Sequence, residues 1–237
     1  MNFKWNVLFV LAFTGFSGTA LSEAVTGKIM IDGQEYGSGS SNVIQGSGNI
    51  VTDKRKLSAF DKLSVNIAAD IEYIASDRYQ LVLTADDNIA PVVTSVVRGS
   101  TLLIDTERSY STGSRVHAKV YGPALLGQLL LDGSSDINLQ GIAGNSFEIN
   151  LDGTGDITAQ GKVKNLIIQV DGSGHVDTKA LHAENVTINV DGSTDVVVTA
   201  TNKLDVTIDG VSDVTYYGHP NAINKSIDGV GEVTAGN

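Results

Sequence analysis

Apolar and polar residues alternate with a period of two through the second half of the chain. Phe147, Ile149 and Leu151 stand at every second position, and the pattern returns at Val186 and Ile188. This spacing is typical of a half-buried β-strand, whereas an amphipathic helix requires apolar residues three and four positions apart. Asp-Gly pairs interrupt the alternation, which predicts short strands separated by tight turns.

The alternating segments form a repeat. LDGTGDITAQG, at residues 151–161, is one of six related segments, and their successive Asp-Gly pairs are 20, 19, 20, 18 and 19 residues apart. The six aspartates of these pairs, called the Asp-Gly row below, are Asp132, Asp152, Asp171, Asp191, Asp209 and Asp228. Such a short unit cannot bury its own apolar face, but it can when it stacks on the next unit. The repeat therefore predicts an all-β fold, a right-handed parallel β-helix or solenoid with coils of about 19 residues.

The first half of the chain is less regular but has the same character. Segments such as KLSVNIAADIEYIA and QLVLTADD alternate or run apolar, and turn signals such as YSTGS separate them. We expect less regular β coils over residues 49–126 and regular repeats over 127–237, with 49–237 forming one continuous domain. Residues 23–48 include a stretch rich in glycine and serine, which predicts a flexible lead-in.

The N-terminus has the features of a secretory signal peptide, expected over residues 1–22. Lys4 precedes an apolar run over residues 7–16 that is too short to span a membrane, and the small residues Ala20 and Ser22 suit cleavage after residue 22. No later segment approaches a transmembrane run, so no integral membrane segment is expected after cleavage. The predicted localisation is exported: periplasmic, cell-surface or secreted.

Composition narrows the range of partners. The chain has 27 Asp and Glu, 16 Lys and Arg, and no Cys. An exported protein without disulfides must be stabilised by packing alone. Residues 127–237 contain 15 acidic residues against 5 lysines, and an acidic surface repels nucleic acid. We therefore expect no nucleic-acid partner, and a glycan or a protein as the ligand at the cell surface.

Several segments carry a resemblance to a known family. The GSGNI entry, the FDKLSVNIAADIEY strand pair, the ADDNI turn and the GSTLLI strand lie within residues 46–104, and DGTGDI and DGSGHV follow in the repeats. In these segments the chain resembles the head GIN domain family, described as auto-transporter adhesins, over about residues 46–237. The resemblance implies an exported, adhesin-like β-solenoid with no established enzymatic activity and no catalytic motif.

Stacking of the repeats places acidic side chains in rows. A second acidic row lies one corner away from the Asp-Gly row and comprises Asp136, Asp156, His175, Asp195, Asp213 and Glu232. Neighbouring coils of a solenoid are about 4.8 Å apart. Two carboxylates at that distance repel by about 0.9 kcal/mol in water and by about 3.5 kcal/mol at an effective dielectric constant of about 20. The Asp-Gly row therefore cannot be buried as bare charges.

Three explanations of the acidic rows remain open. In the first, each aspartate accepts a hydrogen bond from the N–H group two residues on, and the glycine that follows adopts a positive φ. The side chain of each aspartate then points outward, toward water. In the second, calcium lies between the rows, because hard cations prefer several oxygen ligands. The calcium candidates are Asp132, Asp136, Asp152, Asp156, Asp191 and Asp195. In the third, a carboxylate pair cleaves a sugar, although a catalytic site is not normally copied six times.

The positions where the copies differ are the other candidates for binding. His175 replaces an acid in the second acidic row, and with Asp177 it can act as a general base or simply relieve repulsion at the surface. Tyr216, Tyr217 and His219 interrupt the fifth repeat and can form an aromatic platform for a sugar or a loop packed on its neighbour. No cofactor is expected apart from the calcium considered above.

The sequence thus favours an exported, non-enzymatic β-solenoid that acts as a binding, adhesin-like or scaffold module of the cell envelope or surface. The alternative is a carbohydrate-active β-helix enzyme that uses Asp and His groups around residues 152–195. The last repeat has no evident cap, so we also expect that the uncapped end of the solenoid can mediate homo-oligomer formation.

Overall fold

A computed structural model describes residues 28–31, 34–37 and 43–237, and the expected signal peptide lies outside the described residues. The chain divides into two units, residues 1–40 and 41–237. In the first unit, β1 (Lys28–Ile31) and β2 (Gln34–Gly37) pair in antiparallel fashion within the expected lead-in. No helix in the described part of the chain is long and apolar enough to cross a membrane.

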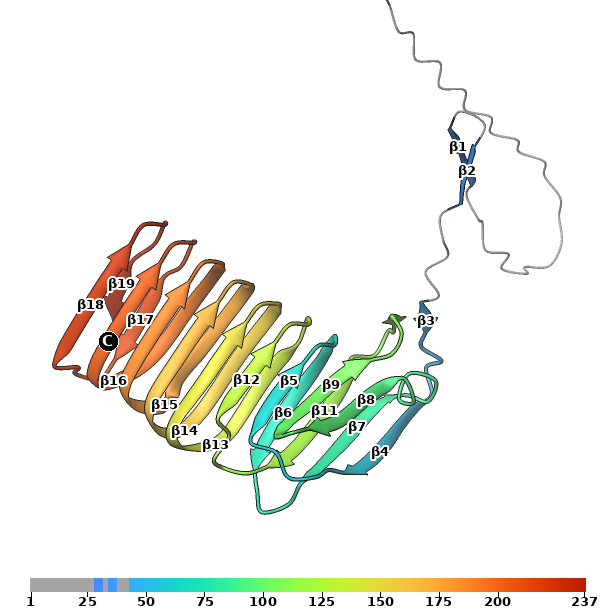
Figure 1. The fold of residues 1–237 in the computed structure, drawn as a ribbon, viewed down its shortest axis with the longest axis horizontal. Coiled ribbons are helices and arrows are strands. Elements are labelled where there is room, and N and C mark those ends of the chain that lie inside the picture. Colours follow the sequence, from blue (N-terminus) through green and yellow to red (C-terminus); the bar gives the residue numbers. More distant parts are fainter. Residues whose placement is uncertain (1–27, 32–33, 38–42) are drawn as a thin grey trace, which may run out of the picture. The chain divides into compact units, whose positions relative to one another are not determined.

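The second unit consists of strands and turns. Its strands are β3 (Ile44–Gln45), β4 (Ile50–Lys56), β5 (Lys62–Val65), β6 (Ala69–Ala75), β7 (Gln80–Asp86), β8 (Val93–Arg98), β9 (Thr101–Thr106), β10 (Tyr110–Ser111), β11 (Val116–Gly122), β12 (Gln128–Leu131), β13 (Asp136–Leu151), β14 (Thr154–Val170), β15 (Ser173–Val190), β16 (Ser193–Ile208), β17 (Val214–Tyr217), β18 (Ala222–Ile227) and β19 (Val233–Ala235). Strands β13 to β16 are long because each bends around the solenoid and contributes to both of its faces (Figure 1).

The strands form two faces that enclose the core. Face I runs through β8, β9, β5 and β12, then the C-terminal parts of β13 to β16, and ends at β18. Face II runs through β4, β7, β11 and β6, then the N-terminal parts of β13 to β16, and ends at β17 and β19. The inward residues of both faces are buried aliphatic side chains, and Phe147 is fully buried among them. The predicted parallel β-solenoid is confirmed.

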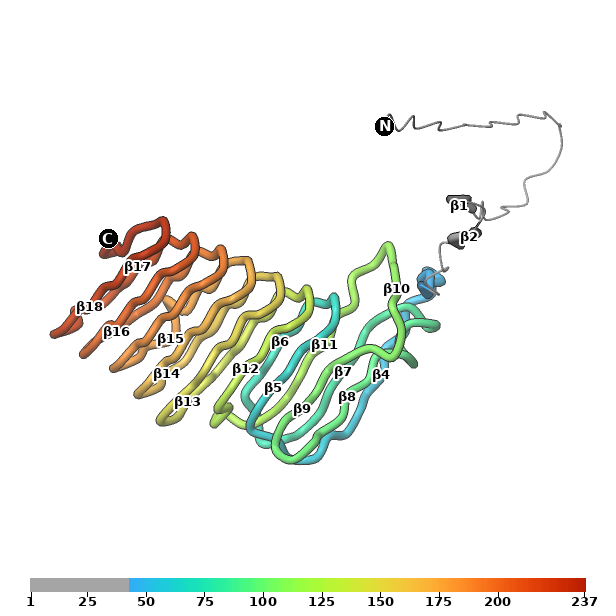
Figure 2. The backbone as a smooth tube through the Cα atoms, turned by 45° about the horizontal axis from the view of Figure 1, so that its top comes forward, coloured from blue at the N-terminus to red at the C-terminus, as the bar shows by residue number. Residues whose placement is uncertain are grey.

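The register of the coils matches the spacing of the repeats. Ile137 pairs with Ile157, which pairs in turn with Val176, then Val196, Val214 and Val233. These steps of 20, 19, 20, 18 and 19 residues are those of the Asp-Gly pairs in the sequence. Figure 2 shows the successive coils lying one beside the next along the molecule. Because each inward residue stacks on an inward residue of the neighbouring coil, the apolar core is continuous.

The N-terminal part departs from a simple succession of coils. The β5–β6 coil lies between the β9–β11 coil and the β12–β13 coil, so the order in space differs from the order in the chain. In addition, β4 and β7 pair antiparallel with each other, β7 with β11, and β8 with β9. The less regular first half is thus a solenoid end closed by antiparallel strands.

The structure corrects the expected role of the turn glycines. Gly153, Gly172 and their equivalents do not have the positive φ that we expected; among the described residues of the repeats, positive φ occurs instead at positions such as Gly155. A Cβ atom at Gly172 would collide with the carbonyl oxygen of Gly153, the glycine stacked on it. The N–H two residues after Asp171, that of Ser173, donates to this same oxygen at 3.0 Å and not to the aspartate. Glycine is therefore required for close stacking of the turns.

An asparagine ladder runs along the edge of the solenoid where each coil passes from face II to face I. Each side-chain amide donates to the asparagine of the preceding coil, with N···O distances of 2.9 Å from Asn185 to Asn165, 2.7 Å from Asn202 to Asn185 and 3.2 Å from Asn221 to Asn202. Asn165 donates to the backbone oxygen of Asn145 at 3.1 Å. The ladder fixes the bend of each coil at the same place.

We expect Asn185→Ala to lower the free energy of unfolding by about 1–2 kcal/mol, because it removes two hydrogen bonds, the one donated to Asn165 and the one accepted from Asn202. Equilibrium urea unfolding followed by circular dichroism measures the change. Gln169→Ala is the control, since it removes an exposed amide from β14 and is expected to change stability by less than about 0.5 kcal/mol. Equal effects of the two variants would show that the ladder does not stabilise the coils.

Basic side chains cross both ends of the described core. At the N-terminal end, Arg55 on β4 reaches across to face I and donates to the carbonyl oxygens of Val93 at 2.7 Å and Ala90 at 2.9 Å. At the other end, Lys225 on β18 stands beside the inward Val206 and donates to the carbonyl oxygen of Val233, on face II, at 2.5 Å.

Lys225 covers part of the end of the last described coil, whereas no described strand pairs with the outer edges of β18 and β19. The aliphatic part of Lys225 lies over the end of the core, and its ammonium group satisfies a backbone carbonyl. The cover is partial, because Ile223 and Ile227 beside it remain 37% and 40% exposed. Homo-oligomer formation through this end stays a prediction.

Candidate functional site

The second acidic row continues beyond the repeats into the N-terminal strands of face II. Asp136 on β13 pairs with Asp70 on β6, Asp70 with His117 on β11, and His117 with Thr84 on β7. A parallel row passes from Asn138 through Glu72 to Lys119 and Val82, and then to Lys54 on the edge strand β4. Because alternate residues of a strand point to the same side, both rows lie on the outer surface of face II.

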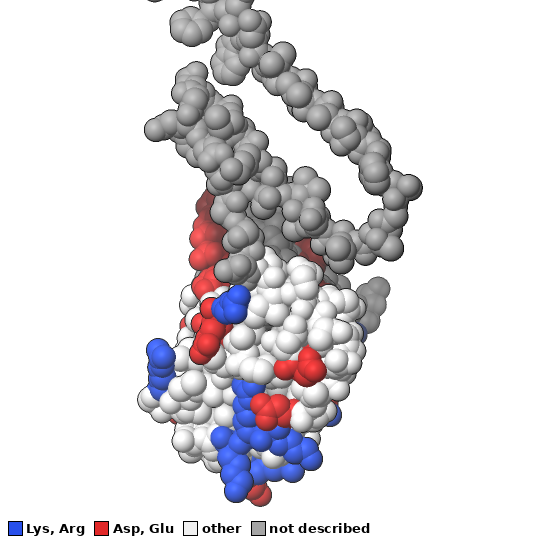
Figure 3. Space-filling model, turned by 90° about the vertical axis from the view of Figure 1, so that its right-hand side faces the viewer, with Lys and Arg blue, Asp and Glu red and all other residues white. Residues whose placement is uncertain are grey.

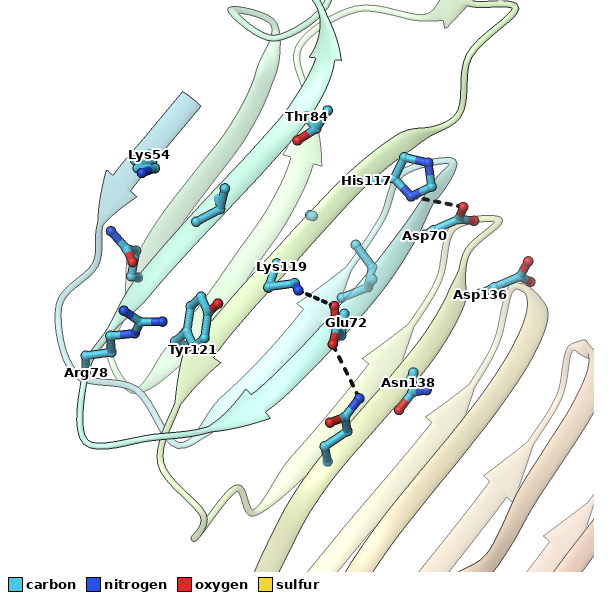
Figure 4. A pocket seen from close by; sticks show the side chains of 15 residues that line it. Lys54, Asp70, Glu72, Arg78, Thr84, His117, Lys119, Tyr121, Asp136 and Asn138 are labelled. Atoms are coloured by element: carbon cyan, nitrogen blue, oxygen red, sulfur yellow. Dashed lines mark hydrogen bonds and ion pairs between the residues drawn. The ribbon is translucent and has the colours of Figure 1, made fainter. Parts of the chain in front are cut away.

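A groove of about 720 Å³ lies over these rows. It spans strands β4, β7, β11, β6 and β13, where the sheet changes from antiparallel to parallel pairing (Figure 4). Most of the residues that line it are polar; they include charged groups, the amides of Gln80, Asn138 and Gln140, and the hydroxyl of Thr84. Tyr121 adds an aromatic ring. This concave surface with convergent hydrogen-bonding groups is the best candidate site among the described residues.

Ion pairs hold the carboxylates of the groove in place. Glu72 accepts a hydrogen bond from Lys119 at 2.8 Å, and this contact raises the pKa of Lys119 above its usual range. Arg115 bridges Asp70 and Asp136, which raises the pKa of the guanidinium. The hydrogen bond from Arg115, together with the carboxylate's contact with the Asp156 N–H, lowers the pKa of Asp136. Asp136 is therefore ionised across the physiological pH range.

The β4 side of the groove is cationic. The guanidinium of Arg78 lies 3.7 Å from the centre of the Tyr121 ring, a cation–π arrangement that favours this position of the two groups. Lys54 lines the same side of the groove from the edge strand. Within the part of the chain that the structure describes, neither cation forms an ion pair, in contrast to Lys119 and Arg115.

Charge is distributed unevenly over the second unit. On the side of the molecule where β4 and β8 lie, Lys and Arg side chains gather on the lower part of the described surface, whereas Asp and Glu form a column (Figure 3). Strand β4 alone carries the exposed lysines Lys54 and Lys56. The groove lies between this basic end and the acidic rows of the repeats.

The predicted acidic residues lie on the surface in two separate rows. All six aspartates of the Asp-Gly row are exposed, as expected from the position of each after an inward aliphatic residue. Asp136, Asp156 and Asp195 of the second acidic row are also exposed, and His175 is half-buried between Asp156 and Asp195. Among the described residues, no group of three or more His, Asp or Glu side chains is arranged to hold a metal ion. Only Asp136 of these candidates lines the groove.

The structure separates the aromatic residues that interrupt the fifth repeat. Tyr216 packs against the core, while the Tyr217 ring lies 3.7 Å from the ammonium group of Lys179 on the outer surface. His219 is exposed in the turn after β17. The two tyrosines therefore do not form one flat platform, because neighbouring residues of a strand point to opposite sides.

Most residues of the groove were not predicted from the sequence, because they lie outside the repeats. A usable signal was present outside them, in ADIEYIA and RVHAKVYG. In the first segment Asp70 and Glu72 alternate with apolar residues, and in the second His117, Lys119 and Tyr121 do so. Two half-buried strands with complementary outward charges are candidates for direct pairing, which is the arrangement in the structure.

These features define a class of protein: a parallel β-solenoid with a polar groove on its N-terminal mixed sheet. A family model described as "Putative auto-transporter adhesin, head GIN domain" matches residues 59–220. The chain belongs to this family, as its resemblance predicted. No curated protein matches the chain.

Solved structures share the fold. A "putative adhesin" from Bacteroides fragilis is 22% identical, with a TM-score of 0.67 over 81% of this chain and 99% of that chain. A "putative adhesin" from Parabacteroides merdae is 17% identical, with a TM-score of 0.56 over 82% of this chain and 99% of that chain. A "Putative lipid binding protein" from Parabacteroides distasonis is 24% identical, with a TM-score of 0.51 over the same shares. These likenesses establish the fold.

Proposed function

We propose that this protein is an exported, non-enzymatic binding module of the cell envelope or cell surface, and that it binds a glycan in the groove on face II. The family and two of the structural neighbours are described as adhesins, which supports a binding role at a surface. The observation that carries the proposal is the groove itself, in which amides, carboxylates and a hydroxyl face one open surface. Such groups form hydrogen bonds with the hydroxyls of a sugar.

The state of the carboxylates favours binding over glycoside cleavage. A glycosidase requires a carboxylic acid whose pKa is raised, so that it can protonate the leaving oxygen. In the groove the pKa of Asp136 is lowered, and Glu72 and Asp70 are engaged by Lys119, Arg115 and His117. These carboxylates are positioned as hydrogen-bond acceptors.

A glycan array probed with the purified chain tests the proposal, followed by calorimetric titration of the glycans that bind. Tyr121→Ala is expected to weaken binding by about tenfold, since it removes the aromatic ring of the groove. Tyr217→Ala is the matched control, because its ring also lies 3.7 Å from a basic group but outside the groove. Binding of no glycan, or equal loss in both variants, contradicts the proposal.

A further inference from the structure

The two ends of the groove have opposite chemistry. On the β6 and β13 side stand Asp70, Glu72 and Asp136, and on the β4 and β7 side stand Lys54 and Arg78 (Figure 4). The acids already have cationic partners within the protein. The ion pairs between Lys119 and Glu72, and between Arg115 and the two aspartates, leave no acid of the lining to neutralise the β4 side.

Lys54 and Arg78 are both exposed, and in the described part of the chain neither contacts a carboxylate. The Arg78 guanidinium nevertheless lies over the Tyr121 ring, and this cation–π contact favours one position of the guanidinium before any ligand arrives. A guanidinium is suited to bidentate contact with a carboxylate, sulfate or phosphate group, and an ammonium group adds a second positive charge. On this side of the groove, the two cations have no anionic partner among the described residues.

From this arrangement we infer that the ligand of the groove is an anionic glycan, whose acidic group binds Lys54 and Arg78. The inference rests on the proposed glycan-binding function and adds the charge and the orientation of the ligand. The sugar hydroxyls then extend toward Glu72, Asn138 and Gln140. A neutral sugar satisfies the acidic side but leaves both cations without a partner.

The orientation follows from charge alone. An acidic group placed toward β13 would meet the three carboxylates of Asp70, Glu72 and Asp136 against the two positive charges of Arg115 and Lys119, so the net charge at that end repels it. The same group placed toward β4 meets two positive charges. The groove therefore has a preferred direction for a ligand with one acidic end, which is a basis for specificity as well as affinity.

The test compares charged and neutral forms of the same sugars. The array carries sialylated, uronate-containing and sulfated glycans beside their desialylated, methyl-esterified and desulfated counterparts. We expect the acidic forms to bind at least about tenfold more tightly, and an increase of ionic strength to weaken their binding. Lys54→Gln and Arg78→Gln are each expected to weaken binding of the acidic forms by about fivefold to tenfold and to leave that of neutral forms unchanged.

Lys56→Gln is the matched control for Lys54→Gln, because both are exposed lysines of β4 and only Lys54 lines the groove. Equal binding of acidic and neutral forms overturns the inference and leaves the proposed glycan-binding function intact. Binding of no glycan overturns both. Binding to vesicles that contain phosphatidylglycerol, without binding to any glycan, also overturns both and identifies a lipid phosphate as the ligand.

Discussion

Replacing Gly172 by alanine is expected to lower the free energy of unfolding by about 3 kcal/mol or more. The new Cβ atom would overlap the carbonyl oxygen of Gly153 in the neighbouring coil, and no flexible side chain is there to move away. The two coils can relieve the overlap only by separating. Separation breaks the hydrogen bonds that the N–H groups of Asp171 and Gly172 donate to the Leu151 oxygen at 3.0 Å and 2.9 Å.

Urea unfolding followed by far-ultraviolet circular dichroism measures this loss. Gly113→Ala is the control, because its φ is not positive and a Cβ atom there meets nothing within 4 Å. We expect this control to change stability by less than about 0.5 kcal/mol. If both variants unfold at the same urea concentration, close stacking of the turns is not what requires glycine in the Asp-Gly pairs.

Arg55→Met is the second variant for which we expect a large loss, of about 3 kcal/mol. Methionine retains the aliphatic part of the side chain but removes the bonds to the Val93 and Ala90 carbonyls, and it leaves Asp53 without the partner that now lies 2.8 Å away. Hydrogen exchange should quicken first in β4 and β8, the strands that Arg55 connects.

Arg98→Met separates this effect from the loss of a positive charge, since Arg98 is exposed on β8. It is expected to change stability by less than about 0.5 kcal/mol. A change in Arg55→Met no larger than that in the control would mean that the antiparallel strands alone close the N-terminal end of the core.

The regular half of the fold could be predicted because its information is local. Each Asp-Gly pair marks a turn, and the spacing between pairs gives the register of the coils directly. The arrangement of β5 and β6 could not be predicted in the same way. It depends on pairing between Ile71 and Ala118, 47 residues apart, and between Ile71 and Ile137, 66 residues apart, with no repeated sequence to indicate either.

The residues of the candidate site also differ in how far they could be predicted, depending on whether they lie in the repeats. Asp136, Asn138 and Gln140 belong to the first repeat, and the repeat pattern identified Asp136, but the other residues of the groove come from the non-repeating part of the chain. The role of glycine in the turns was mispredicted because an Asp-Gly pair in isolation suggests a positive φ. In a stack of coils, the backbone of the neighbouring turn lies so close that a Cβ atom at this glycine would overlap it. This close approach requires glycine even though its φ is not positive. The asparagine ladder was overlooked because most of its members lie within the long strands at the places where the alternation of buried and outward residues is interrupted.

The interleaved order of the N-terminal coils has a kinetic consequence. The repeats pair with neighbours about 20 residues away and can form as soon as one coil is present on which the next can stack. Strand β6 can pair only after β11 and β13 are in place. The long segments between these strands must therefore lose conformational entropy before the contacts of β6 form. The groove is built from these late strands. We therefore expect the repeats to fold before the groove, so that the proposed ligand binds only chains whose N-terminal coils have folded.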